Sequence, residues 1–359
     1  MRRHKLLLLI ALLAPAFAVR ASDKPLLIEL SPRSGALPSG VSASGAVVVG
    51  GLGSGGGFYW MPTTGDIFIG GLSASNVSGD GHTIVGTVLD SRVTQAAVWV
   101  RAAEWRLLGS LRPGAEPCDT SLSSATDTSR DGRIVVGYGY DGCNITHALR
   151  WEGSGVVDLG SSVEGRPSIA LGVSADGRVT VGSQTQADGF VRGAQWVDGR
   201  QELFPGPDGL VGAAQAASSD GSIVVGRICS PASIAGDPNY QSAWMWTRQD
   251  GTRCLPAPRL RPSPGPPINV GANATSDDGR VMGGSQGIGQ DDTEAIIWID
   301  RVPYYLKDYL RANGVPNAFE TWINTGSIND VSPDGRILVG KGAAAAGFRG
   351  YIVILGDRP

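Results

Sequence analysis

The chain has 359 residues, of which 53 are glycine and 22 are proline, and its formal net charge is −3. So much glycine and proline leaves little room for long helices, which excludes a fold built on them. A slightly acidic chain without a basic stripe also excludes nucleic acid and anionic membrane surfaces as partners.

Residues 1–18, MRRHKLLLLIALLAPAFA, have the features of a secretory signal peptide. A basic head precedes a short apolar run, and Ala16-Phe17-Ala18 is a small-x-small cleavage signal. We expect cleavage after Ala18 or as late as residues 21–23. No second long apolar run follows, so we expect a secreted or periplasmic protein without a membrane span after cleavage.

Residues 24–30, KPLLIEL, alternate in the manner of a strand. Leu26, Ile28 and Leu30 would share one wholly apolar face, and such a strand needs a sheet to cover that face.

Seven segments further along the chain repeat one phrase, of which VSADGRVTVGS from Val173 is an example. An Asp-Gly turn joins two short strands there, since glycine adopts a positive φ without a steric penalty and aspartate bonds locally. The central glycines of the seven copies are Gly45, Gly81, Gly132, Gly177, Gly221, Gly279 and Gly335.

A second phrase, a small residue three positions before a tryptophan, follows six of the copies. A third phrase, a short strand with leucine near its end, then closes most repeats. The tryptophans of the second phrase are Trp60, Trp99, Trp151, Trp196, Trp246 and Trp298. Because they recur once per repeat, we interpret them as packing between repeats rather than as platforms for sugars.

Each repeat thus predicts four antiparallel strands in roughly 40–50 residues, which is typical of a β-propeller blade. The sixth repeat departs from this pattern. Residues 305–313 have helical spacing, with Leu306 and Leu310 on one face, and Gly314 and Pro316 end the helix. A strand resumes at Trp322.

The seventh copy ends near Leu355 without a fourth strand, whereas residues 24–30 form a strand without a third strand before it. We therefore predict an all-β, seven-bladed β-propeller of four-stranded blades, with one short inserted helix. The N-terminal strand would close the last blade, and residues 24–355 would form a single domain. An open solenoid would need caps instead.

Four cysteines in an exported chain predict disulfides, and three connectivities are possible. Proximity within repeats favours Cys118–Cys143 and Cys229–Cys254.

Residues for metal or acid–base chemistry are scarce. Only His82 and His147 remain after signal removal, and they lie in different repeats. The acidic cluster Asp291, Asp292 and Glu294 lacks the pattern of a calcium loop, so we interpret it as a charged loop. We expect no catalytic residue, no metal site and no cofactor.

The loops between the second and third strands vary most in length, and variable loops on a rigid scaffold are where binding usually occurs. The alternative explanation is that these loops vary in length without any functional role. The candidate contact residues are Tyr138, Tyr140, Asp141, Asp237, Tyr240, Asp291 and Asp292.

Strung together, the three phrases resemble the HAF repeat of extracellular bacterial proteins over about residues 40–355. The segment LKDYLRANGV, followed by WINTGSINDVSPDGRILVGKG, is similar to the closing portion of such chains. The first copy departs from the pattern, because Ser44 stands where aspartate is usual. The resemblance implies an exported bacterial protein, often surface-associated, and it implies no particular reaction.

These observations lead us to expect a monomeric, non-catalytic module that binds a protein or glycan partner through one face. The alternative is a carbohydrate-active enzyme on the same scaffold, such as a polysaccharide lyase or a glycoside hydrolase. That alternative needs facing carboxylates or a Tyr/His/Arg set on one face.

Overall fold

The computed structural model describes residues 24–30, 35–101, 104–111, 122–141, 145–207, 209, 211–229, 242–258, 269–287 and 293–356. The expected signal peptide and the expected Cys118–Cys143 pair lie outside the described residues.

The described residues form 28 strands and one helix, so the fold is all-β. The first sheet contains β2 (Ala36–Val41), β3 (Val48–Leu52), β4 (Gly57–Met61) and β5 (Gly65–Gly70). The second contains β6 (Ser73–Val77), β7 (Thr83–Asp90), β8 (Val93–Val100) and β9 (Trp105–Leu107). The third contains β10 (Ser123–Thr128), β11 (Ile134–Tyr140), β12 (Thr146–Glu152) and β13 (Gly155–Asp158).

The fourth sheet contains β14 (Ser168–Val173), β15 (Val179–Thr185), β16 (Val191–Val197) and β17 (Arg200–Leu203). Next come two groups of four, which are β18 (Ala214–Ala217), β19 (Ile223–Cys229), β20 (Ser242–Thr247) and β21 (Gly251–Cys254), and then β22 (Val270–Thr275), β23 (Val281–Gly287), β24 (Thr293–Ile299) and β25 (Val302–Tyr305). The pair Arg227↔Gly271 joins these two groups into one eight-stranded sheet.

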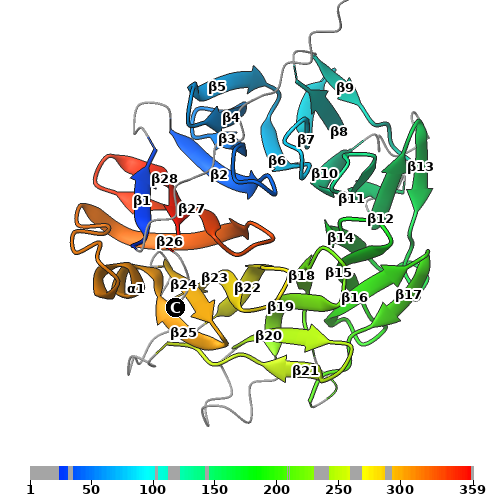
Figure 1. Cartoon of the computed structure of the whole chain (residues 1–359). Coiled ribbons are helices and arrows are strands. Elements are labelled where there is room, and N and C mark those ends of the chain that lie inside the picture. The colour runs from blue at the N-terminus through cyan, green and yellow to red at the C-terminus, as the bar shows by residue number, and fades with distance from the viewer. Residues whose placement is uncertain are drawn as a thin grey trace, which may run out of the picture.

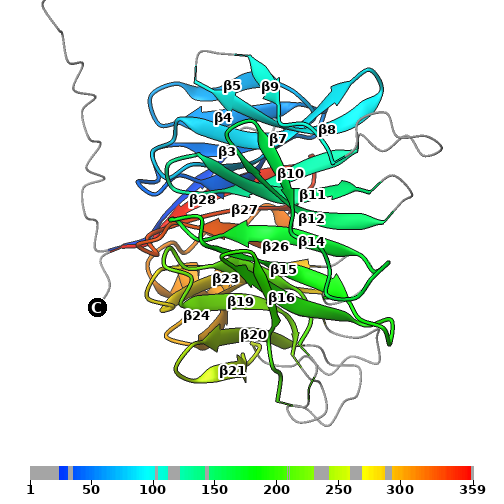
Figure 2. The same cartoon turned by 90° about the vertical axis from the view of Figure 1, so that its right-hand side faces the viewer.

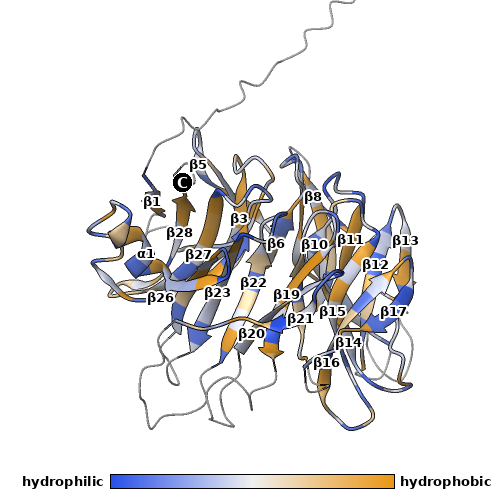
Figure 3. Cartoon of the chain, turned by 60° about the horizontal axis from the view of Figure 1, so that its bottom comes forward, coloured by the Kyte–Doolittle hydropathy of each residue, from blue (hydrophilic) through white to orange (hydrophobic). Residues whose placement is uncertain are grey.

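The last sheet combines both ends of the described chain. It contains β26 (Trp322–Val331), β27 (Ile337–Ala344), β28 (Gly347–Ile354) and β1 (Leu26–Glu29). Figure 1 shows that all the sheets are arranged around one axis, with the first strand of each repeat innermost. Seen from the side in Figure 2, the strands run roughly along this axis, so their ends form two opposite faces. Apolar residues lie on strands such as β28, whereas the outer strand β17 is hydrophilic (Figure 3).

The Asp-Gly turns explain why the repeated phrase contains serine. In the fourth sheet, the buried Ser174 hydroxyl donates to Asp176 Oδ1 over 2.7 Å and accepts the Val179 N–H over 3.0 Å. Gly177 has φ +75°, and a Cβ there would lie 2.6 Å from Ile134 Cγ1 in the preceding sheet. Glycine is therefore required both by the turn and by the contact with the neighbouring sheet.

The tryptophans join neighbouring sheets, as expected. Trp151, Trp196 and Trp298 are at most 1% exposed. Each indole N–H donates to a main-chain carbonyl at the end of the preceding repeat, and the acceptors are Gly109 (3.1 Å), Leu159 (3.0 Å) and Pro256 (2.7 Å). These acceptors lie in the third phrase of the repeat, which explains why that phrase recurs together with the tryptophan.

Two tryptophans of the set depart from the expectation of full burial. Trp60 and Trp246 are only partly buried. In β20 the fully buried indole is that of Trp244, which packs on Phe204 with ring centroids 5.3 Å apart. Trp244 and Phe204 fill the space between the fourth sheet and the eight-stranded sheet, so Trp246 is left partly outside it.

The predicted pairing of the N-terminal strand is confirmed. β1 pairs antiparallel with β28 from Leu26↔Ile354 to Glu29↔Tyr351, and the Leu30 N–H donates to the Gly350 carbonyl over 2.9 Å. The expected apolar face is wrong at one end, because Leu26 is 52% exposed. β1 lies between two hydrophobic clusters. Leu27 packs against one of them, whereas Leu30 belongs to the other and Ile28 packs against it.

The helix and one disulfide also agree with expectation. α1 (Leu306–Ala312) buries Leu306 and Leu310 completely, and Gly314 follows with φ +99°. Cys229 and Cys254 form a disulfide with their Cα atoms 5.5 Å apart. None of the helical structure in the described ranges has the length and apolar character that a membrane span requires.

Candidate functional site

A cavity of about 370 Å³ is enclosed by the first strands of the repeats, and it is the candidate site. Its walls come from the innermost strand of every repeat, namely β2, β6, β10, β14, β18, β22 and β26, together with Arg227 from β19. Most of the lining side chains are small or polar, and none of the described lining residues is aromatic. We call this feature the axial cavity.

One end of the axial cavity is bounded by the residue that follows the serine in each Asp-Gly turn. We call these residues the mouth ring, and they are Ala43, Gly79, Arg130, Ala175, Ser219, Asp277 and Pro333. Main-chain hydrogen bonds of 2.8–3.1 Å run from one repeat to the next for most of its members, as from the Gly79 N–H to the Arg130 carbonyl. The mouth ring therefore joins neighbouring sheets at the axis.

Two joints of the mouth ring differ from the others. The Ser219 N–H donates to Asp277 Oδ1 over 2.7 Å rather than to a main-chain carbonyl. Pro333 has no N–H to donate. The side chain of Asp277 thereby replaces a peptide group in the ring.

The first strands contain a β-bulge next to the mouth ring, and the bulge residues bond across to the following sheet. Thr126 Oγ1 donates to the Ala170 carbonyl over 3.0 Å, and Asn329 Nδ2 donates to the Pro38 carbonyl over 2.6 Å. Ser39 and Asn273 make the same kind of bond, to the carbonyls of Ala74 and Ile328. The cavity wall is thus held together by polar side chains.

Asp127 occupies the position two residues before the turn serine. Its Oδ1 accepts from the Thr128 N–H (2.7 Å) and Asn76 Nδ2 (2.6 Å), and its Oδ2 accepts from the Val173 N–H (2.8 Å) of the next sheet. Burial raises the pKa of the Asp127 carboxyl to about 6, although these hydrogen bonds act in the opposite direction.

Asp330 occupies the equivalent position in the last sheet. It accepts from the Val331 N–H (2.8 Å) and from the Val41 N–H (2.9 Å), so it links the last sheet to the first. Burial raises the pKa of Asp330 to about 7, and the charge of Asp127 raises it further, whereas the two hydrogen bonds lower it.

Two arginines also line the axial cavity. Arg130 belongs to the mouth ring, and its Nη2 donates to Ser219 Oγ over 3.2 Å across the position of Ala175. Arg227 lies beside Gly271 near the start of β22, where it remains accessible to solvent and its Nη2 donates to Asn273 Oδ1 over 2.6 Å. Partial desolvation by the cavity wall lowers the pKa of the Arg227 guanidinium below its ordinary value, and an arginine remains protonated at neutral pH.

Of the loop residues selected from the sequence, those that the structure describes lie at the other end of the strands from the mouth ring. Tyr138 and Tyr140 are in the last half of β11, which starts beside its Asp-Gly turn and runs away from it. Neither they nor Asp141 line the axial cavity. Asp237, Tyr240, Asp291 and Asp292 lie outside the described residues, and a binding role for the whole set stays a prediction.

A small polar cluster accompanies Asp141. His147 Nδ1 lies 2.8 Å from Asp158 Oδ2, and His147 Nε2 lies 3.7 Å from Asp141 Oδ2. His82, by contrast, is exposed directly after its turn glycine, as expected. The structure therefore brings Asp141 together with a histidine that the sequence places only in a strand.

The sequence contains a signal for the axial cavity that the motif search did not use. The position two residues before the turn serine varies, whereas the serine and glycine recur. Its occupants are Gly40, Asn76, Asp127, Gly172, Ala216, Ala274 and Asp330. Polar residues at a position that otherwise holds only glycine or alanine indicate a local requirement beyond the fold.

No protein-family model matches the sequence, and no curated protein does. Among solved structures, the chain is similar to the β-propeller domain of the Trilobed protease from Pyrococcus furiosus, with 14% identity and a TM-score of 0.53. That match covers 93% of this chain and 96% of the other, whose description reports an open velcro topology. Here, by contrast, the first and last strands pair.

The chain is also similar to the GH74 xyloglucanase from Xanthomonas campestris, with 13% identity and a TM-score of 0.53. This match covers 91% of this chain and 53% of the xyloglucanase. At such identities the likeness concerns the fold alone. The fold is a β-propeller.

Proposed function

We propose that the chain is an exported, non-catalytic β-propeller of seven blades whose axial cavity binds a protein or glycan partner. The eight-stranded sheet counts as two blades in this proposal, because Arg227↔Gly271 is the only residue pair of the described strands that joins its halves. Membership of the HAF-repeat proteins, a single domain and a monomeric state belong to the same proposal. The signal-like N-terminus and the Cys229–Cys254 disulfide support an extracellular or periplasmic location.

The observation that carries a binding role is the use made of the two cavity carboxylates. Each oxygen of Asp127 and of Asp330 already accepts a main-chain N–H within or between sheets. A general acid or a nucleophile has to approach the reacting atom, and these hydrogen bonds hold both carboxyl groups against the cavity wall, which favours a structural use of them. The cavity therefore offers a fixed polar surface rather than mobile catalytic groups.

A carbohydrate-active enzyme is the second candidate, and one observation favours it. Asp127 and Asp330 line the same cavity, and both have a raised pKa, which is a property of general acids in glycoside hydrolysis. The likeness to a xyloglucanase adds nothing to this argument, because it concerns the fold only.

The test compares the wild-type protein with Ala175→Phe, which narrows the mouth ring, and with Ala187→Phe, on an exposed hairpin at the opposite end. Each protein is screened against a glycan array and a displayed peptide library. We expect ligands that Ala175→Phe loses and Ala187→Phe keeps.

A ligand that Ala175→Phe retains would place binding elsewhere and contradict the proposal. Release of new reducing ends or of unsaturated sugars from a polysaccharide, abolished by Asp330→Asn, would establish the enzyme instead.

A further inference from the structure

Arg227 has a position that no other described cavity residue has, because it comes from a second strand rather than a first. β19 loses its register with β20 between Gly226 and Cys229, and there Arg227 pairs with Gly271 of β22. A Cβ on Gly271 would lie 2.7 Å from Arg227 Cγ and 2.9 Å from its Nε. The absence of a side chain at Gly271 therefore makes room for the arginine.

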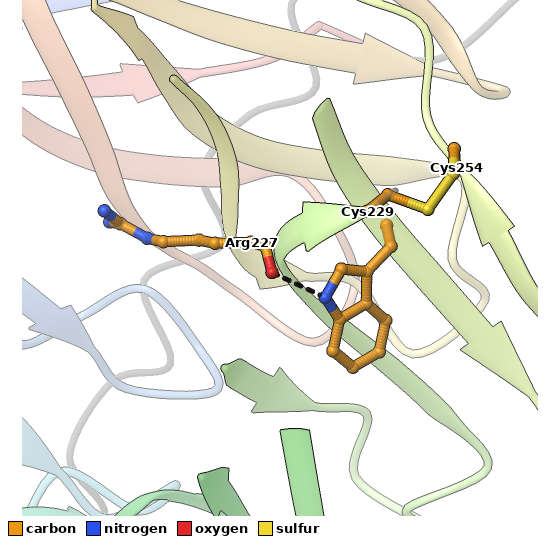
Figure 4. The surroundings of a disulfide bond; sticks show 4 residues. Arg227, Cys229 and Cys254 are labelled. Atoms are coloured by element: carbon orange, nitrogen blue, oxygen red, sulfur yellow. Dashed lines mark hydrogen bonds between the residues drawn. A yellow bond between two sulfur atoms is a disulfide. The ribbon is translucent and has the colours of Figure 1, made fainter. Parts of the chain in front are cut away.

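A hydrogen bond and a disulfide fix the main chain at Arg227 and just after it. The Trp244 indole N–H donates to the Arg227 carbonyl over 2.9 Å, and Cys229 is tied to Cys254. Ile228 between them has φ +64°, a conformation that a β-branched residue adopts only when its surroundings impose it. Figure 4 shows the Arg227 side chain extending away from the disulfide. These contacts fix the direction of the side chain at its base.

Most hydrogen-bond donors of the Arg227 guanidinium group have no partner among the described residues. It has five N–H donors, and within the described residues it makes one hydrogen bond, to Asn273. No carboxylate of the described residues forms an ion pair with it. A solvent-accessible cation with open donors among the described residues is suited to an anionic ligand.

The acidic residues of the cavity do not remove this preference. The oxygens of Asp127 and Asp330 are occupied by N–H groups, and burial raises both pKa values toward neutrality, which reduces their negative charge. Asp277 accepts the Ser219 N–H at the mouth ring, where Arg130 provides a second cation.

We infer that the axial cavity binds an acidic peptide segment and that a carboxylate of this segment pairs with Arg227 after passing Arg130 at the mouth ring. This inference rests on the proposed function of the cavity as a binding site. A single carboxylate matches one open guanidinium face, whereas a phosphate dianion would be repelled more strongly by Asp127, Asp330 and Asp277. The described lining has no aromatic ring on which a sugar could stack, and its amide, hydroxyl and main-chain groups match those of a peptide.

The test uses two probes that differ only in the carboxylate, acetyl-Ala-Glu-Ala-amide and acetyl-Ala-Gln-Ala-amide, in calorimetric titrations of the full protein. We expect the glutamate peptide to bind at least tenfold more tightly. Arg227→Gln should abolish the difference, and Arg227→Lys should retain part of it. Arg178→Gln is the control, because Arg178 pairs with Asp198 on the outer part of the fourth sheet and leaves the cavity unchanged.

The pH dependence of peptide binding supplies a second readout, because the two cavity aspartates have raised pKa values. Protonation of Asp127 and Asp330 removes negative charge, so binding of the glutamate peptide should tighten several-fold from pH 8 to pH 5.5. The charged groups facing the ligand are these two aspartates, Asp277, Arg130 and Arg227.

Three outcomes would overturn the inference, and they separate it from the proposed function. If both peptides bound equally and Ala175→Phe abolished their binding, the cavity would still be a binding site, but a ligand carboxylate would play no part in recognition. Binding of galacturonate but of neither peptide, lost in Arg227→Gln, would replace the peptide by an acidic glycan. Peptide binding that Ala175→Phe leaves unchanged would overturn both proposals.

Discussion

Asp127 and Asp131 are four residues apart in the same repeat, yet their environments shift the pKa values of their carboxyl groups in opposite directions. Asp131 is in the Asp-Gly turn with its side chain 57% exposed, and hydrogen bonds from Ser129 and the Arg133 N–H hold its pKa below the usual value. Asp127 accepts at least as many hydrogen bonds, but burial raises its pKa to about 6. Burial, and not the number of donors, decides the direction of the shift.

This comparison separates two kinds of position in the repeat. The turn recurs with the same bonds, as Asp176 shows with its lowered pKa and its bonds from Ser174 and the Arg178 N–H. The position of Asp127 varies from glycine to aspartate between repeats. The turns maintain the fold, and the variable axial positions give the cavity its particular chemistry.

The largest expected effect concerns the turn glycine. Gly177→Ala should lower the free energy of unfolding by about 2–5 kcal/mol, since it adds left-handed strain to a clash with Ile134. Gly199→Ala is the matched control, because Gly199 has φ +80° but nothing near its Cβ, and it should cost about 1–2 kcal/mol. Urea denaturation measures both. Equal losses would show that the turn does not hold neighbouring sheets together.

The next largest effect is a difference in the free energy of unfolding between variants of Asp127 and Asp131. Asp127→Ala should cost about 1–3 kcal/mol at pH 5, because the Val173 N–H loses its acceptor inside the protein. Asp131→Ala should cost less, since its exposed turn can bond to water. Chemical denaturation of both variants gives the order, and a larger loss for Asp131→Ala would reverse the comparison.

The pH dependence of stability should differ in sign between the two regions. The folded-state pKa values of Asp127 and Asp330 lie above the ordinary value of 3.8, so the folded state binds protons more readily. Their contribution therefore falls as pH rises from about 4 to about 7. The pKa of Asp131 is lowered, so its contribution is present above 3.8 and is lost as pH falls below that value.

Denaturation curves from pH 3 to pH 8 test these signs. Asp330→Asn should flatten the decline between pH 4 and pH 7, and Asp131→Asn should flatten only the acid limb. If Asp330→Asn left the decline unchanged, the enclosed carboxyl would not titrate as described.

The smallest effect is expected at the mouth ring. Arg130→Gln should change the free energy of unfolding by less than about 0.5 kcal/mol, because its guanidinium is exposed and, among the described side chains, bonds to Ser219 Oγ alone. A loss of several kcal/mol in thermal or urea denaturation would make Arg130 part of the structural region rather than of the cavity.

Much of the fold could be predicted from the sequence because the repeated phrase encodes local geometry. Asp-Gly turns, alternating strands and recurring tryptophans each depend on residues close in the chain. The pairing of β1 with β28 and the Cys229–Cys254 disulfide also followed from position within the repeats. The exposure of Leu26 and of Trp246 did not, because it depends on which neighbour fills the adjacent space.

The candidate site was much less accessible to prediction. Its walls come from every repeat, and each repeat contributes only a few small or polar residues. Attention to loop length led to Tyr138 and Tyr140, at the opposite strand ends from the mouth ring. Arg227 reaches the cavity because β19 changes its pairing partner near Gly271. A periodic sequence pattern does not predict such a change of pairing.

The sheet that contains β1 has a consequence for the order of folding. Every other four-stranded unit is built from one continuous segment, whereas this sheet has to bring residues 26 and 354 together. The entropic cost in free energy of closing a loop rises by about 0.6 kcal/mol for each doubling of the loop length. The loop between the two chain ends is about three doublings longer than the loop within one repeat. Contacts between residues so distant in sequence form slowly. The seam between the chain ends should therefore be the last part of the ring to form, and the first at which amide hydrogens exchange when the ring opens.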